Sequence, residues 1–163
     1  MVEIHFCKKE QLPLIQILAN EIWPEVYDYM ISTEQIQYML NKMYSLQSLE
    51  EQWQNGHQFI VLYDHQTPVG FAAFEKGKEG NTHLHKLYLK KQEHQKGLGK
   101  KMLNFVLEYC RSHDQTSVTL NVNRNNKSLA FYIANGFQIM RSVDISIGEG
   151  FEMNDYIMHR SLL

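Results

Sequence analysis

The strongest structural signal in the sequence is an amphipathic stripe that begins after Gly97. Leu98, Met102, Val106 and Cys110 recur every four residues, so they share one face of a helix. A glycine at a helix start lets the backbone approach a ligand closely, and the first amides of a helix have no partner within it. Because the helix dipole and nearby lysines add positive charge, this start predicts an anion-binding site.

Two common phosphate-binding motifs do not fit this turn. A dinucleotide-binding fingerprint needs a third glycine where the chain has Met102. A P-loop needs glycine where the chain has His94, and serine or threonine where it has Lys101. A different nucleotide or phosphate ligand on the same helix start is therefore disfavoured.

Length and charge narrow the class of protein. The chain has 163 residues, which indicates a single domain over residues 1–163. A net charge of -2 argues against a general nucleic-acid binder, so no nucleic-acid partner is expected. The segment from Lys86 to Lys101 nevertheless carries +5 and the remainder -7. This asymmetry favours a small polyanionic ligand, with a solvated lysine-rich loop as the alternative.

Two further features concern the compartment. Cys7 and Cys110 are too few for a disulfide scaffold and suit a reducing environment. No apolar run has the length of a signal peptide or of a membrane span. The sequence therefore predicts a cytoplasmic protein without membrane contact.

The first third of the chain has the spacing of helices. Apolar residues predict a helix over Gln11–Ile22 that Pro24 ends. Another helix is expected behind Ser32, which with Gln35 has the form of a capping box. A short helical segment at Leu46–Trp53 follows.

The hydrophobic period then changes to that of strands. The expected strands, of which the first is an edge strand at the start of the chain, are Val2–Phe6, Phe59–Tyr63, Val69–Phe74, Thr82–Leu89, Val118–Val122, Phe137–Val143 and Phe151–Met158. Two helices interrupt them, one after Gly97 and one over Ser128–Ala134. Helices followed by a mostly antiparallel sheet predict an α+β fold.

Two segments resemble the signatures of the GNAT superfamily of acetyl-CoA-dependent N-acetyltransferases. His94–Gly99 occupies the family's Gln/Arg-x-x-Gly-x-Gly/Ala loop, with His94 in place of glutamine or arginine and Gln95 one residue later. Asn125–Phe137 is similar to the family's second signature, Asn-x-x-Ala/Ser-x-x-Phe/Leu-Tyr-x-x-x-Gly-Phe, at every defining position. The resemblance runs from Phe59 to the C-terminus and implies a mixed, mostly antiparallel twisted sheet that is flanked by helices and split at the cofactor site.

The resemblance also implies an activity. The protein would move an acetyl group from acetyl-CoA directly to a primary amine of a small molecule or peptide, without an acyl-enzyme. A non-catalytic acyl-CoA-binding sensor of the same fold is the alternative. The residues then expected at the cofactor are Leu87, Tyr88, Leu89, His94, Gln95, Lys96, Gly97, Leu98, Gly99, Lys100, Asn125, Ser128 and Tyr132.

These residues have different implied roles. Backbone groups of Leu87 and Leu89 would pair with the pantetheine arm like an added strand, whereas their side chains suit the core. The amides of residues 95–100 would surround the pyrophosphate. Asn125 would hydrogen-bond the arm, and Lys127 or Ser128 would lie near the phosphates or the adenine.

Two proton transfers require further groups. Tyr132 matches the tyrosine near the coenzyme sulfur, and its phenol can give a proton to the departing thiolate; the alternative is a core aromatic. The amine must lose a proton, and the family position for a base falls on His83. On a regular strand His83, His85 and Leu87 share a face, so His83, His85 or a water is the candidate base. The alternative is a pair of solvent-facing histidines.

Three expectations complete the interpretation. No third ligand stands at useful spacing beside His83 and His85, so no metal is expected. In the family, the helical first third forms one wall of the acceptor cleft, where Glu21, Glu25 and Asp28 would suit a cationic amine. Cys110 is expected to be a buried small hydrophobe rather than a nucleophile. The sequence identifies no acceptor and leaves a homodimer open.

Overall fold

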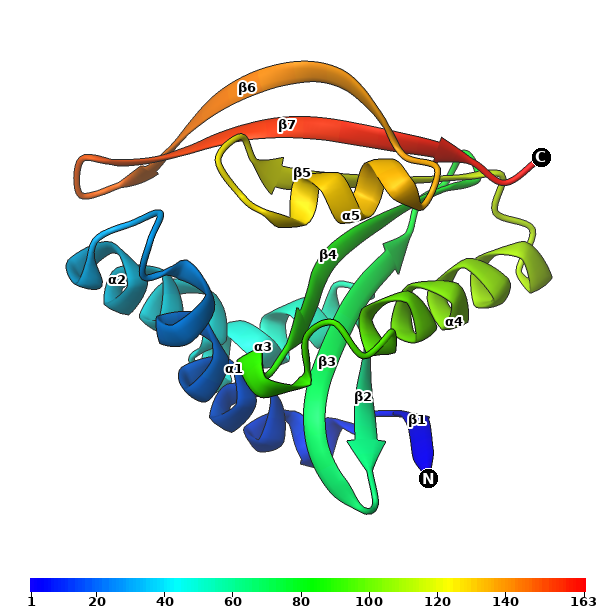
Figure 1. Ribbon diagram of the computed structural model, residues 1–163, viewed down its shortest axis with the longest axis horizontal. Helices are drawn as coiled ribbons and strands as arrows, with labels where there is room; N and C mark the ends of the chain where they lie inside the picture. The colour runs from blue at the N-terminus through cyan, green and yellow to red at the C-terminus, as the bar shows by residue number, and fades with distance from the viewer.

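The computed structural model covers residues 1–163 and forms a twisted sheet with helices on both faces (Figure 1). The seven strands lie in the order β1-β2-β3-β4-β5-β7-β6, and β4–β5 is the only parallel pair. The expected α+β fold with a mixed, mostly antiparallel sheet is therefore confirmed.

The elements follow the predicted order closely. The strands are β1 (Val2–Phe6), β2 (Gln58–Asp64), β3 (Thr67–Lys76), β4 (Asn81–Leu89), β5 (Ser117–Asn123), β6 (Gln138–Gly148) and β7 (Phe151–Ser161). The helices are α1 (Leu12–Tyr27), α2 (Thr33–Tyr44), α3 (Leu46–Gln54), α4 (Leu98–Ser112) and α5 (Ser128–Ala134), and the short 3-10 turn η2 spans Lys91–Glu93. None of the helices combines the length and the apolar character that a membrane span requires.

Two apolar layers hold the helices to the sheet. On one face, called here the α4 face, Met102, Leu103 and Val106 pack with Leu84 of β4 in one buried cluster. On the opposite face, the α1–α3 face, helices α1, α2 and α3 bury a second cluster against β2 and β3. The period-four stripe of α4 lies in the first cluster, including Cys110, as its spacing predicts.

Helix α1 does not end at Pro24. It continues to Tyr27 with the proline inside it, so the predicted end at Ile22 is wrong. A proline within a helix loses one backbone hydrogen bond. Here the aromatic rings of Trp23 and Tyr27 pack against Tyr88 of β4, with centroids 5.6 and 6.0 Å away, and this contact favours the longer helix.

Only half of the predicted capping box forms at the start of α2. The Ser32 hydroxyl accepts a hydrogen bond from the Gln35 amide at 3.1 Å. The Gln35 side chain does not return to Ser32; its amide group donates to the Glu152 carbonyl of β7 at 3.2 Å. The second half of the box is thus exchanged for a tertiary contact.

That contact belongs to a wider attachment of the β6–β7 hairpin to α2. The Tyr38 hydroxyl and the Lys42 ammonium both donate to the Ile147 carbonyl near the hairpin turn. The next residue, Gly148, has a φ of +93°, and a Cβ there would lie 2.6 Å from the Tyr38 oxygen. The close approach of hairpin and helix therefore requires glycine at this position.

A bulge in β4 reverses the expected side of its last residues. The register with β3 shifts where Ala73 pairs with Lys86 and Phe74 pairs with Leu84. His85 and Lys86 consequently both face the α1–α3 side, and Leu87 packs with the cluster on the α4 face. The expectation that Leu87 shares a face with His83 and His85 is wrong, because strand alternation fails at the bulge.

The sheet splits between its two parallel strands. β4 pairs with β5 only from Asn81 to Leu84, opposite Ser117 to Leu120. β4 then continues to Leu89 and β5 to Asn123 without pairing to one another, and Figure 1 shows them diverging. One edge of β4 at residues 85–89 is therefore left without a strand partner.

Candidate active site

The turn that joins β4 to α4 contains two residues in the left-handed region of backbone conformation, which most residue types rarely adopt. Gly97 at the start of α4 has a φ of +78°, and Gln95 two residues earlier has a φ of +65°. A Cβ on Gly97 would meet nothing within 4 Å, so backbone conformation and not crowding calls for glycine there. The first amides of α4 have no partner within the helix, so they can donate hydrogen bonds to an anion.

His94, which departs from the family pattern, stabilises this turn. Its Nε2 atom lies 3.0 Å from the carbonyl oxygen of Leu89, so the imidazole donates back to the end of β4. A second link joins the Lys90 amide to the Val69 carbonyl at 2.9 Å. The side chain of His94 thus orders the turn that its backbone belongs to.

The lysines between Lys86 and Lys101 do not share one environment. Lys86 is buried on the α1–α3 face, Lys90 pairs with Glu21 at 3.2 Å, and Lys96 pairs with Glu93 at 3.1 Å. The predicted single cationic island is therefore wrong for Lys86, which lies on the other side of the sheet. Lys100 and Lys101 remain exposed without an ion pair at the start of α4.

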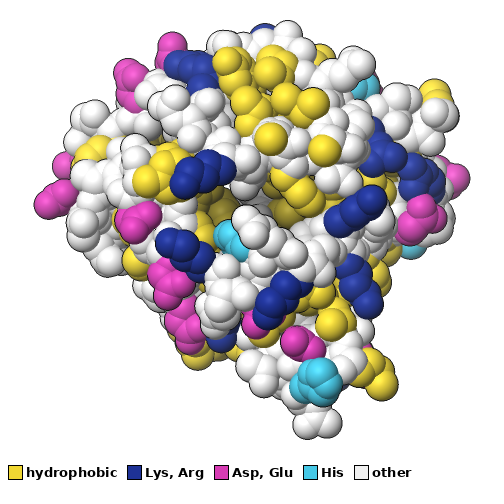
Figure 2. Space-filling view, in the orientation of Figure 1, with side chains coloured by type: hydrophobic (Ala, Val, Ile, Leu, Met, Phe, Trp, Pro, Cys, Tyr) yellow, Lys and Arg dark blue, Asp and Glu magenta, His cyan; other side chains and the backbone are white.

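A hollow opens on the face that carries α4 and α5. Figure 2 shows it near the centre of the view, with hydrophobic side chains at its floor and several Lys or Arg side chains around its rim. Positive charge at the rim of an apolar hollow suits a ligand that has both an anionic group and an apolar arm.

Tyr132 lies in α5 with its ring among apolar neighbours. The ring centroids of Phe131 and Phe137 are 5.2 and 5.7 Å away, and only 8% of Tyr132 is exposed. Its hydroxyl makes no hydrogen bond within the protein. Burial, with a smaller contribution from Tyr27, holds the pKa of the phenol above its ordinary value, so the group carries its proton at neutral pH.

The other predicted residues of the second signature stand at the entrance to α5. Asn125 is exposed, and its side chain makes no hydrogen bond within the protein, so it is free for a ligand. The Ser128 amide donates to the Asn126 side chain at 2.8 Å. The Lys127 amide donates to the Tyr29 hydroxyl at 2.9 Å, which joins the α1–α2 loop to α5.

Tyr88 anchors the unpaired end of β4 to α1. Its hydroxyl lies 2.9 Å from the Tyr27 hydroxyl, and its ring packs against Trp23. Leu87 and Leu89 on either side turn to the α4 face. Their side chains belong to the core, as the sequence predicts, so only their backbone groups are offered to the open edge.

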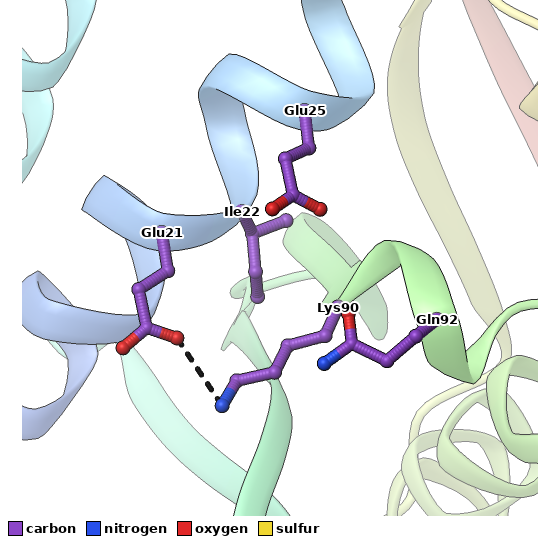
Figure 3. Close-up of a pocket in the computed structure, with 5 residues that line it drawn as sticks. All are labelled: Glu21, Ile22, Glu25, Lys90 and Gln92. Carbon is purple, nitrogen blue, oxygen red and sulfur yellow. Dashed lines mark ion pairs between the residues drawn. The ribbon is translucent and has the colours of Figure 1, made fainter.

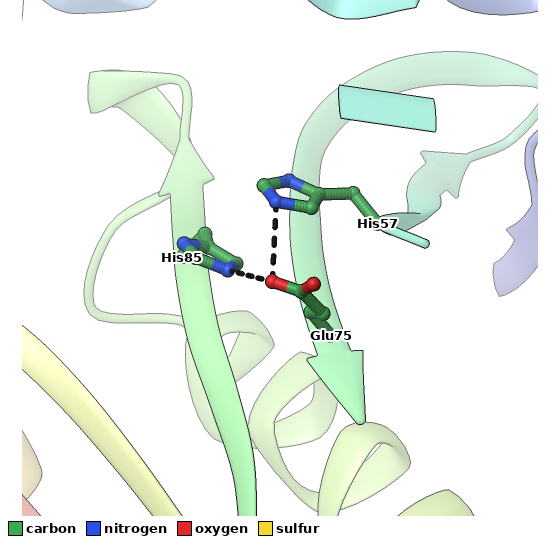
Figure 4. Close-up of side chains that lie close together, drawn as sticks. All are labelled: His57, Glu75 and His85. Carbon is green, nitrogen blue, oxygen red and sulfur yellow. Dashed lines mark hydrogen bonds and ion pairs between the residues drawn. The ribbon is translucent and has the colours of Figure 1, made fainter. Parts of the chain in front are cut away.

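The two histidines of β4 lie on the α1–α3 face, where Thr119, His57 and Glu75 surround them. His83 Nδ1 lies 2.9 Å from the Thr119 hydroxyl of β5, and the His85 ring centroid is 4.6 Å from that of His83. His85 and His57 both contact Glu75, as Figure 4 shows. Burial lowers the pKa of His83, and burial with the neighbouring His57 and His83 lowers the pKa of His85 to about 4. Both rings are therefore neutral at neutral pH.

Sequence reasoning missed His57 and Glu75, and only Glu75 left a signal. The hairpin turn between β3 and β4 places Glu75 opposite His83, so counting back from the turn would have found it. His57 lies just before β2, and no local spacing relates it to β4. No third ligand stands at useful sequence spacing beside the β4 histidines, but the fold brings these two residues to His85, so three candidate ligand atoms gather there.

The acids of the first third do not gather into one site. Glu21 and Glu25 line a surface pocket with Ile22, Lys90 and Gln92, and Figure 3 shows Glu21 paired with Lys90. Glu25 has no ion pair. Asp28 does not line this pocket.

Both cysteines are buried and free. Burial raises the pKa of the Cys110 thiol and raises that of Cys7 to about 11. A thiol that keeps its proton is a poor nucleophile, so the structure agrees with a packing role for Cys110.

Comparison with known proteins gives consistent relatives. Residues 28–158 match the family model described as acetyltransferase (GNAT) domain. An uncharacterised N-acetyltransferase of Mycobacterium tuberculosis is 32% identical over 96 residues, which is 58% of this chain and 61% of that protein. The chain therefore matches about three fifths of the length of this curated relative.

Solved structures share the fold over the whole chain. The PaiA N-acetyltransferase from Thermoplasma acidophilum, in complex with coenzyme A, has a TM-score of 0.82 and 24% identity, and the match covers 99% of each chain. The ribosomal-protein-S18-alanine N-acetyltransferase from Escherichia coli has a TM-score of 0.76 and 14% identity over 99% of this chain and 94% of that one. With most of its length matched by the family model, this chain belongs to the GNAT acetyltransferase family.

Proposed function

We propose that this protein is an acetyl-CoA-dependent N-acetyltransferase that acts in the cytoplasm as one domain, residues 1–163. Its acceptor would be a primary amine of a small molecule or a peptide, acetylated by direct transfer. The observation that carries the proposal is the open edge of β4 beside the glycine turn. A linear ligand with an anionic end can lie along residues 85–89 and reach the free amides of α4.

Each end of such a ligand has matching groups. The amides of the turn from Gln95 to Lys100 would hold a pyrophosphate, and the unpaired backbone at Leu87 and Leu89 would hydrogen-bond an amide-bearing arm. The free side chain of Asn125, two residues after the end of β5, would be a further donor. The PaiA structure contains coenzyme A, a ligand with this chemistry.

The transfer needs one acid and one base. Acetyl-CoA supplies the acetyl group as a thioester. Attack by the amine nitrogen forms the new C–N bond as the C–S bond breaks. Tyr132 would give its phenolic proton to the sulfur, and His83 would accept the proton that the amine loses. The Thr119 hydroxyl, 2.9 Å from His83 Nδ1, holds that ring where β4 and β5 part.

The first test is a thermal-shift titration of one protein preparation with acetyl-CoA, CoA, ATP and NAD. Selective stabilisation by the two CoA species is expected, because only a ligand of the folded state raises its melting temperature. The second test measures release of the free CoA thiol with a panel of primary amines. Turnover with any amine supports the enzyme. Tight CoA binding without turnover favours the acyl-CoA sensor, and preference for ATP or NAD contradicts the proposal.

A further inference from the structure

Three side chains that are distant in the sequence meet on the α1–α3 face. His57 precedes β2, Glu75 lies near the end of β3, and His85 occupies the bulge of β4 (Figure 4). The Nε2 atoms of His57 and His85 lie 3.4 and 3.1 Å from the same oxygen, Oε1 of Glu75. The three ligand-type atoms all lie within 4.8 Å of one another.

The two imidazoles converge on one point. Their rings are stacked with centroids 4.1 Å apart and planes inclined by 14°, and each ring presents its Nε2 atom to the same carboxylate oxygen of Glu75. Two imidazole nitrogens and one carboxylate oxygen form a ligand set that zinc takes at about 2.0–2.2 Å, with a fourth position left for water. We propose that His57, Glu75 and His85 form a zinc-binding site beside the active-site gap.

The cluster can admit an ion and adjust to it. The side chains of His57, His85 and Glu75 are 13%, 28% and 37% exposed, so solvent reaches the space between them. An ion on both Nε2 atoms would occupy the space where Glu75 Oε1 now lies. Because Glu75 is the most exposed of the three, its carboxylate can draw back to ligand distance without repacking the core.

One positive group opposes the ion. Lys86 is buried near the cluster, its ammonium donates to the Gln52 side chain at 2.7 Å, and it lies 5.4 Å from the Tyr44 ring centroid. The carboxylate of Glu75 offsets this charge, but the lysine weakens the attraction of the site for a divalent cation. Lys86→Met keeps an unbranched apolar chain and removes the charge, so it should tighten zinc binding.

The experiment uses the full chain, freed of any histidine tag and of metal by chelation. Zn²⁺ is titrated while thermal unfolding is followed, and Co²⁺ is titrated as a spectroscopic probe of ligand geometry. We expect saturation at one equivalent, a higher melting temperature and a visible absorption band of Co²⁺ in a low-coordinate site. His57→Gln and Glu75→Gln should each weaken binding at least tenfold, and Lys86→Met should strengthen it.

The matched control is His5→Gln. His5 contacts Glu3 at 2.9 Å on the protein surface, a histidine–carboxylate pair without a third ligand, and its loss should leave metal binding unchanged. Circular dichroism confirms that each variant is folded. Binding that survives both His57→Gln and Glu75→Gln, or no saturable binding in tenfold excess of metal, overturns the zinc site.

Discussion

The Nε2 atom of His94 lies 3.0 Å from the Leu89 carbonyl, which closes the turn between β4 and α4. The residue that departs from the family pattern thus has a defined structural role. By ordering the turn, His94 keeps the amides that we propose for the pyrophosphate exposed and without partners in the protein.

Replacing this histidine should therefore weaken cofactor binding. His94→Ala removes one hydrogen bond, worth about 0.5–1.5 kcal/mol, so the Kd for acetyl-CoA should rise by about two- to tenfold. Isothermal titration calorimetry measures the change. Gln92→Ala, an exposed residue near the same turn, is the control and should bind normally. An unchanged Kd in His94→Ala would contradict the role of the turn.

The two glycines of the turn should respond differently to alanine. Gly97→Ala places a side chain at a φ of +78°, which costs about 1–2 kcal/mol and lowers the melting temperature by about 2–4 °C for each kcal/mol. At Gly99 a Cβ would meet the Phe131 ring at 3.5 Å, an ordinary contact, so Gly99→Ala should not destabilise the free protein. Acetyl-CoA binding should also stay near normal, because the added methyl group faces the Phe131 ring and the family loop has glycine or alanine at this position. Thermal unfolding with and without ligand separates the two effects, and equal behaviour of both variants would be evidence against this assignment.

Tyr132→Phe tests the proposed general acid. Without the phenolic proton the thiolate must leave unassisted, so turnover should fall at least tenfold with little change in the Kd for acetyl-CoA. Steady-state kinetics and calorimetry provide the two values. The control is Tyr109→Phe, which removes a hydroxyl that accepts from Gln58 at 3.0 Å outside the proposed site. Full turnover in Tyr132→Phe would show that the ring serves only the core.

Asp155 should cost the protein stability at neutral pH. The residue is 2% exposed, and its Oδ2 atom has no hydrogen-bond partner. Burial raises its pKa, with Asn121 and Arg124 opposing the shift. A raised pKa means that the folded state holds the proton more tightly than the unfolded state. Wild-type stability is therefore lost as pH rises from the unfolded pKa through the folded one.

The variant Asp155→Asn removes this loss. Its advantage in denaturant unfolding should be largest at neutral pH and should shrink as pH falls through the folded pKa toward the unfolded value. Asp114→Asn is the control, since Asp114 is an exposed carboxylate in the turn after α4. A stability difference that does not depend on pH would refute the electrostatic explanation.

Most of the fold could be predicted because its signals are local. The period of four in α4, the change to a strand period after Phe59, and the short helix Ser128–Ala134 depend on neighbours in the sequence. Pro24 does not end α1, because the tertiary packing of Trp23 and Tyr27 outweighs a local helix breaker. Local propensity carries no information about that packing.

The candidate site, like the fold, could be predicted only where its signals are local in the sequence. The glycine turn and Tyr132 stand out as motifs, but the bulge at His85 has no sequence signature, so regular strand alternation predicts the wrong face of the sheet for Leu87. His57 reaches His85 only through the pairing of β2, β3 and β4. Such a cluster is a property of the register of the sheet, which single residues do not encode.

The attachment of the β6–β7 hairpin to α2 has a consequence for the gap in the sheet. The half of the sheet that carries α2 and the half that carries the hairpin are joined by the β4–β5 ladder at one end. Tyr38, Lys42 and Gln35 join them again at the other. The two halves of the sheet are thus connected at both ends of the gap, so its width is fixed before a ligand binds. A ligand arm entering it meets a preformed width and spends little free energy on ordering the protein around itself.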